Sequence, residues 1–93
     1  MKLPVNYINM DVVFRRIVRE EYIKRQDDKC YYCKELLTLK PANKVLNKPI
    51  NKKYFPKGFF RWPIHLHHNH KTGMTIGAVH NYCNAVLWQY DKE

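Results

Sequence analysis

Two pairs of metal-binding residues constrain the fold of this chain more than any other feature of its sequence. Cys30 and Cys33 form a Cys-x-x-Cys pair, and His80 and Cys83 form a His-x-x-Cys pair. Each pair offers two ligands on one tight turn, and together they make the Cys3His set of a tetrahedral structural zinc site. Because the pairs lie far apart in the sequence, the residues between them must form a structure that the zinc closes at its base.

The small size of the chain also supports the prediction of a structural zinc site. With 93 residues the chain predicts one small domain, and a domain of this size is expected to need a cross-link besides its core. Its three cysteines cannot all pair in disulfides. Two alternatives to a shared zinc remain: a redox-active Cys-x-x-Cys, or buried thiols beside an unrelated surface histidine.

The chain is strongly basic, with 17 Lys and Arg residues against 8 Asp and Glu and a net charge of +9. Such an excess favours a polyanionic partner, and nucleic acid is the leading candidate. A basic protein without such a partner is the alternative. No apolar run approaches the roughly 20 residues that span a bilayer, and the first residues lack the apolar stretch of a signal peptide. We therefore expect no membrane partner and a cytoplasmic location.

The residues before the first cysteine pair predict a helix. Asp11 suits the N-cap, and the helix runs to about Gln26. Apolar side chains recur at helical spacing, at Val13, Phe14, Ile17, Val18 and Tyr22. The basic side chains, which fall largely on the other side of the helix, are Arg15, Arg16, Arg19, Lys24 and Arg25. This basic face either follows phosphates or is a solvated helix face.

The segment 40–57 predicts an irregular, basic connection, because prolines recur among its Asn and Lys residues. Residues 52–62 then mix cations with aromatic rings, which suits contact with a nucleic-acid backbone and its bases. In so small a domain several rings must fill the core, and we assign Phe59, Phe60 and Trp62 to it. The lysines of this segment are then the expected nucleic-acid contacts.

The last third of the chain predicts a strand, a loop, a second strand and a helix, over 63–67, 69–73, 74–79 and 81–90. Four histidines lie within six residues here, and they are His65, His67, His68 and His70. Strand alternation places His67 and His68 on opposite faces, so both can reach one phosphate only if the strand breaks at His68. We expect His65 to be structural or solvent-facing.

This order of motifs resembles the HNH, or ββα-metal, endonucleases, and most of all the zinc-bearing branch that includes phage recombination endonuclease VII. In that branch a Cys-x-x-Cys, an Asp-His-Asp-His-x-Thr-Gly loop, a glycine-rich second strand and a Cys-Asn pair follow one another. Here His67-His68-Asn69-His70-Lys71-Thr72-Gly73 stands in place of the loop, and Cys83-Asn84 in place of the Cys-Asn pair. The resemblance covers Cys30 to about Tyr90 and leaves the first helix outside.

The resemblance implies a small α+β domain with an N-terminal helix, zinc knuckles and an HNH nuclease core. Residues 1–29 would be the helical segment and residues 30–93 the zinc-stabilised core, within one compact domain. The implied activity is metal-dependent hydrolysis of DNA phosphodiester bonds, by nicking or double-strand cleavage. The expected enzyme is a monomer or homodimer. One form of this expectation is a phage-encoded enzyme that acts in the host cytoplasm. The alternative is a non-catalytic zinc-knuckle module that only binds nucleic acid.

The resemblance also implies roles for individual residues. His68 would be the general base that takes a proton from the attacking water, and an ordinary imidazole pKa of about 6.5 suits this role. His67 and Asn84 would hold one divalent ion, either Mg²⁺ or another ion such as Mn²⁺ or Ni²⁺. His67 and Asn69 replace the aspartates of the branch, and imidazole shifts the preference toward ions softer than Mg²⁺. His70 would contact phosphate or orient its neighbours.

Basic residues on either side of the first strand are the expected DNA contacts. Those just before the strand can reach phosphates that flank the cut, and one lies in the loop after it. They are Lys52, Lys53, Lys57, Arg61 and Lys71. Such side chains neutralise phosphates in DNA of any base sequence, so they would position the DNA without recognising its bases.

Overall fold

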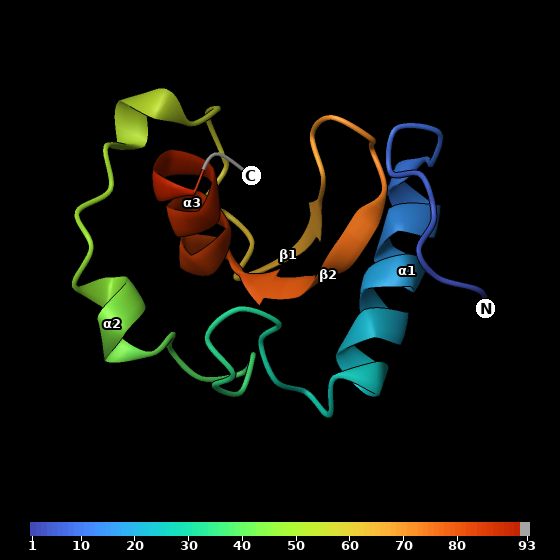
Figure 1. The fold of residues 1–93 in the computed structure, drawn as a ribbon, viewed down its shortest axis with the longest axis horizontal. Helices are drawn as coiled ribbons and strands as arrows, with labels where there is room; N and C mark the ends of the chain where they lie inside the picture. The colour runs from blue at the N-terminus through green and yellow to red at the C-terminus, as the bar shows by residue number, and fades with distance from the viewer. Residues whose placement is uncertain (92–93) are drawn as a thin grey trace.

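The computed structural model describes residues 1–91 as a two-stranded hairpin held between helices (Figure 1). The elements follow in the order α1 (Val12–Arg25), α2 (Asn43–Leu46), the 3-10 helix η1 (Lys52–Tyr54), β1 (Ile64–His68), β2 (Thr75–His80) and α3 (Asn81–Tyr90). The hairpin has α1 on one side and α3 on the other. The expected α+β class is confirmed. None of the helices in residues 1–91 combines the length and the apolar character that crossing a bilayer requires.

The first helix forms where the sequence predicts it. The Asp11 carboxylate accepts a hydrogen bond from the N–H of Phe14 at 2.8 Å and so caps the first turn. The predicted apolar face is only partly covered: Val18 is fully buried, whereas Val13 is 59 % exposed. A two-stranded hairpin is too narrow to cover the whole face, which leaves the amino-terminal turns of α1 open to solvent.

The two strands pair antiparallel, each displaced by one residue from its predicted position. His67 pairs with Gly77 and His68 with Thr75, so the ladder skips Ile76 and β2 carries one extra residue there. A bulge of this kind bends the strand and turns the neighbouring side chains. It lies opposite the two adjacent histidines of β1.

The outer edge of β2 is covered by residues from the amino-terminal third of the chain. The carbonyl of Val5 accepts from the N–H of Thr75 at 2.9 Å. Further along, the Gln26 amide pairs with Ala78: its oxygen accepts from the Ala78 N–H, and its NH2 donates to the Ala78 carbonyl, both at 2.9 Å. A Cβ on Gly77 would lie 2.8 Å from the same amide oxygen, so this close approach requires glycine. Within residues 1–91 no further backbone hydrogen bond covers the edge of β1.

The core has two parts. The larger part surrounds the three cysteines and consists of Cys30, Cys33, Leu37, Val45, Ala78, Val79, Cys83 and Val86. The smaller part joins α1 to the hairpin through Met10, Val18 and Leu66. The predicted metal ligands therefore lie inside the main core.

The middle of the chain is more regular than its sequence suggested. The segment 40–57, predicted to be irregular, contains both α2 and η1. Val45 is 1 % exposed and packs in the main core. This one apolar anchor is enough to order a short helix between the prolines.

The aromatic residues before β1 pack differently from the prediction. Phe59 and Phe60 are half-buried and contact the ring of Phe55, which is itself buried and packs against Trp88. Trp62 is 66 % exposed, so its assignment to the core was wrong. Phe55 occupies the core position, and Trp62 is left at the surface.

Replacing Gln26 with alanine should destabilise the domain by about 1–3 kcal/mol, because the buried N–H of Ala78 loses its partner. Urea unfolding followed by circular dichroism measures the change. Glu20→Ala is the matched control: Glu20 is an exposed residue of α1, and its loss should matter by less than about 0.5 kcal/mol. Equal unfolding midpoints for the two variants would contradict the proposed contribution of this amide.

Candidate metal centre and histidine cleft

The four residues predicted to bind zinc come together in the core. Cys30 and Cys33 lie on the turn after α1, His80 ends β2, and Cys83 lies in the first turn of α3. All four are buried, and their ligand atoms lie within 4.8 Å of one another. This donor set and spacing could hold one tetrahedral zinc ion.

His80 is oriented as a metal ligand by its second ring nitrogen. Its Nε2–H donates to the carbonyls of Leu36 at 3.0 Å and Leu39 at 2.9 Å. Its Nδ1 therefore carries no proton, and it lies 3.5 Å from the sulfur of Cys33 and 3.6 Å from that of Cys83. Metal-binding histidines usually have an outer hydrogen bond of this kind, which fixes the tautomer and the ring.

A hydrogen bond links the thiols of Cys30 and Cys83 and shifts their pKa values in opposite directions. A hydrogen bond from Cys83 lowers the pKa of Cys30 to about 4. The same bond, together with burial, raises the pKa of Cys83. A zinc ion binds thiolates, so its binding would release the remaining protons of the cluster.

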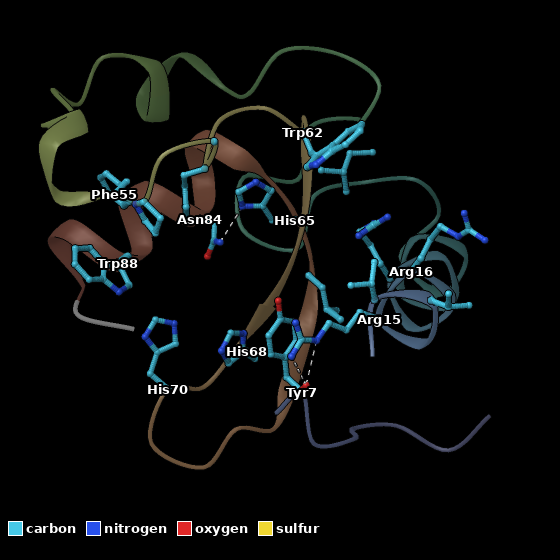
Figure 2. A pocket seen from close by; sticks show the side chains of 18 of the residues that line it. Tyr7, Arg15, Arg16, Phe55, Trp62, His65, His68, His70, Asn84 and Trp88 are labelled. Atoms are coloured by element: carbon cyan, nitrogen blue, oxygen red, sulfur yellow. Dashed lines mark hydrogen bonds between the residues drawn. The ribbon is translucent and has the colours of Figure 1, made fainter. Parts of the chain in front are cut away.

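A second group of side chains gathers around Asn84 of α3. Its amide oxygen accepts a hydrogen bond from Nδ1 of His67, and its NH2 donates to Nδ1 of His65, each at 3.1 Å. Figure 2 shows the bond between Asn84 and His65. His65 and His67 alternate along β1 and so lie on the same face of the strand. His65 therefore has a structural role, which is to fix the direction of the Asn84 amide.

The distance between His67 and Asn84 suits a shared divalent ion. Two ligands of one ion, each about 2.1 Å away and at a right angle, lie about 3.0 Å apart. The observed 3.1 Å between Nδ1 and Oδ1 fits this arrangement as well as the hydrogen bond. His67 is 2 % exposed. Since these are only two neutral ligands, water and substrate would have to complete the shell.

His68 lies on the other face of β1, stacked on Tyr7. The two ring centroids are 3.9 Å apart and the planes differ by 5°. The Arg15 guanidinium lies 3.9 Å from the centroid of the same Tyr7 ring, which leaves room for the two groups only on opposite faces. Arg15 also donates to the carbonyl of Tyr7 at 3.2 and 3.3 Å. The imidazole is thus held in one orientation.

The surroundings of His68 keep its imidazole neutral. Burial, then the positive charges of His70 and His67, lower the pKa of His68 to about 4. The ring of His70 lies 4.9 Å away. A neutral His68 can accept a proton, but it is a weaker base than the ordinary histidine assumed from the sequence. An anionic phosphate beside it would raise this pKa.

A cavity of about 810 Å³ runs along the uncovered edge of β1, between α1 and the segment 54–62. Side chains from both faces of the strand line it, His65 from one face and His68 from the other, together with His70 and Asn84 (Figure 2). The conflict predicted for the adjacent His67 and His68 remains, because His68 lines the cleft whereas His67 is buried and does not. The strand ends at His68, and both of its faces open onto one cleft at the free edge.

The basic residues expected to contact DNA do not line this cleft. All of them are exposed, and they are Lys52, Lys53, Lys57, Arg61 and Lys71. The cations that do line it belong to α1, and they are Arg15, Arg16 and Arg19. From the sequence alone, this basic face of α1 could either contact phosphates or simply be solvated.

Two features of the site were missed in the sequence. Tyr7 carries no motif, and its contact with His68 joins segments far apart in the chain. Asn69 was noted as a departure from aspartate and, with Gly73, as a residue that favours the loop, but its hydrogen bonds were not predicted: its side-chain oxygen accepts from the N–H groups of Lys71 at 2.8 Å and Thr72 at 2.9 Å. An Asn at the start of a loop that ends in glycine is a turn signal, so this second role was open to prediction.

Comparison of the chain with protein-family models, with curated proteins and with solved structures returned no significant match. The resemblance to zinc-bearing HNH endonucleases therefore rests on the order of the sequence motifs alone. No family is assigned to the chain.

The buried ligand set predicts that the purified protein binds about one equivalent of zinc. Cys33→Ser should lose the metal and unfold at a much lower temperature, because metal binding and folding are coupled in small domains. Elemental analysis and thermal unfolding measure both effects. His70→Ala removes an exposed histidine outside the set and should keep its zinc. A metal-free protein with full thermal stability would be incompatible with a structural role for zinc.

Proposed function

We propose that this chain is a metal-dependent endonuclease of the HNH type that hydrolyses phosphodiester bonds of DNA. The observation that carries the proposal is that Asn84, bonded to the buried His67, and the neutral imidazole of His68 line one cleft. A zinc ion at the Cys3His cluster has a structural role in this proposal. The net charge of +9 supports a polyanionic substrate.

In this mechanism each side chain of the cleft has a separate task. His68 accepts the proton of the attacking water, and its stacking on Tyr7 holds the ring toward the cleft. His67 and Asn84 would hold the catalytic divalent ion, with the amide oxygen of Asn84 kept in place by the bond from its NH2 to His65. Such an ion, when bound, would supply Lewis-acid stabilisation of charge on the phosphate and the departing oxygen. His70, beside His68, is placed to contact phosphate.

One observation favours the second candidate, a zinc-knuckle module that binds nucleic acid without cutting it. Within residues 1–91 none of the residues that line the cleft is Asp or Glu, and hard ions such as Mg²⁺ are usually held by carboxylates. A softer ion held by imidazole and amide answers this objection. The two candidates differ in one result, which is cleavage of DNA under any divalent ion.

His68→Ala should lower the rate of plasmid nicking by about 10²- to 10⁴-fold, as expected for the loss of a general base. Conversion of supercoiled plasmid to open-circle and linear forms measures the rate, across Mg²⁺, Mn²⁺, Ni²⁺ and Zn²⁺. Zinc content and the circular dichroism spectrum should be unchanged. Glu20→Ala, purified in parallel, controls for contaminating nucleases and should cleave at the wild-type rate. Unchanged cleavage by His68→Ala would remove this residue from the mechanism.

His67→Asp should keep activity and move the optimum from softer ions toward Mg²⁺, because it introduces a hard carboxylate ligand. His67→Ala and Asn84→Ala should lose activity and recover part of it at raised ion concentration, since each leaves a single protein ligand. Nicking rates measured against the concentration of each ion give both results. A His67→Asp protein that contains its zinc and is inactive with every ion would show that His67 is not a metal ligand.

A further inference from the structure

The cleft has two chemically different walls. One is α1, which contributes Arg16 and Arg19. The other contains Phe55 and Trp88, whose rings pack together. Figure 2 shows Arg15 and Arg16 on one side of the central histidines, with Trp62 on the same side, and Phe55 and Trp88 on the opposite side. An occupant of the cleft therefore meets cations and the Trp62 ring on one side and further aromatic rings on the other.

The positively charged side chains that line the cleft favour an anionic ligand. Among residues 1–91, none that lines the cleft is acidic, and the one salt bridge joins Arg25 to Glu21, away from the cleft lining. Within this part of the chain Arg16 and Arg19 thus have no carboxylate partner.

The exposed aromatic rings of the cleft lining favour binding of unpaired bases. Trp62 is 66 % exposed and Tyr54 is 59 % exposed, so both rings are accessible where they border the cleft. Aromatic side chains bind nucleic acid by stacking on the faces of bases. Those faces are covered in a duplex by the neighbouring base pairs, and they are accessible only in an unpaired strand.

We propose that the cleft binds one unpaired strand of nucleic acid, with phosphates on Arg16 and Arg19 and a base stacked on Trp62. The inference rests on the proposed nuclease function and names its substrate class, which is single-stranded or locally unpaired nucleic acid. It also gives a role to α1, which lies outside the region of resemblance. The exposed lysines of η1 become secondary contacts.

Binding is tested with the zinc-loaded full-length protein and a fluorescein-labelled oligo(dT) of about 12 nucleotides, against a duplex of equal length. Fluorescence anisotropy is recorded with no divalent ion added, so that binding is measured without cleavage. The single strand should bind more tightly than the duplex. Replacing Arg16 and Arg19 together with glutamine should lower the salt slope for the single strand by about 1.4, at roughly 0.7 for each lost phosphate contact. The matched control removes the same charge from two exposed lysines outside the cleft, Lys40 and Lys44, and should leave the slope nearly unchanged.

The stacking contact is tested at Trp62, whose exposure makes its replacement compatible with folding. Trp62→Ala should weaken binding of the single strand about tenfold or more and change duplex binding less than about twofold. Trp62→Phe keeps an aromatic face and should recover most of the affinity. An RNA oligonucleotide of matched sequence, oligo(U), shows whether the cleft also accepts a ribose backbone.

Two results would overturn the inference: equal binding of duplex and single strand that is insensitive to Trp62→Ala, or equal losses in the arginine and lysine double variants. Plasmid cleavage by a protein that gives these results would retain the nuclease and reject the cleft as a strand-binding site. The predicted binding without cleavage under any divalent ion would retain the cleft and reject the nuclease. The two proposals therefore fail separately.

Discussion

The buried Cys3His cluster is the constraint on which the rest of the structure depends. It brings the turn after α1, the end of β2 and the start of α3 to one point in the core. His80 is both the last residue of β2 and the N-cap of α3, so a residue that could ligate a metal also sets the direction of the helix that carries Asn84. A small core gives limited stability, and a metal held here stabilises the fold and orients the site together.

The free edge of β1 is the second feature that shapes the site. The outer edge of β2 is occupied by the backbone near Val5 and by the Gln26 amide, which leaves β1 to border the cleft. Side chains from both faces of a strand can approach the same space only at an uncovered edge. This is why His65 and His68, which point to opposite faces, line one cavity. A third strand paired with β1 would separate them.

The electrostatics of the cleft favour an anionic ligand. Within residues 1–91 its lining contains arginines and histidines and no acidic residue. Burial and neighbouring positive charges keep His68 neutral, and a phosphate in the cleft would act in the opposite direction and favour the protonated form. The described lining lacks the carboxylates usual at a catalytic magnesium ion, so in the proposed nuclease the anionic ligands would come from the nucleic acid.

The sequence alone determined the features that depend on local spacing: the capped first helix, the two ligand pairs, and the strand, loop, strand and helix that follow. Near neighbours in the chain decide such features, through caps, turns and alternation. It also identified the residues around Asn84 as candidates, but His65 was assigned no part in holding Asn84. Only the tertiary structure decided that Tyr7 stacks on His68, that Gln26 pairs with β2, and that Phe55 is buried in place of Trp62. Each of these is a side-chain contact between distant segments, or follows from such a contact. Such contacts depend on how the helices pack around the narrow hairpin, and no local sequence pattern encodes them.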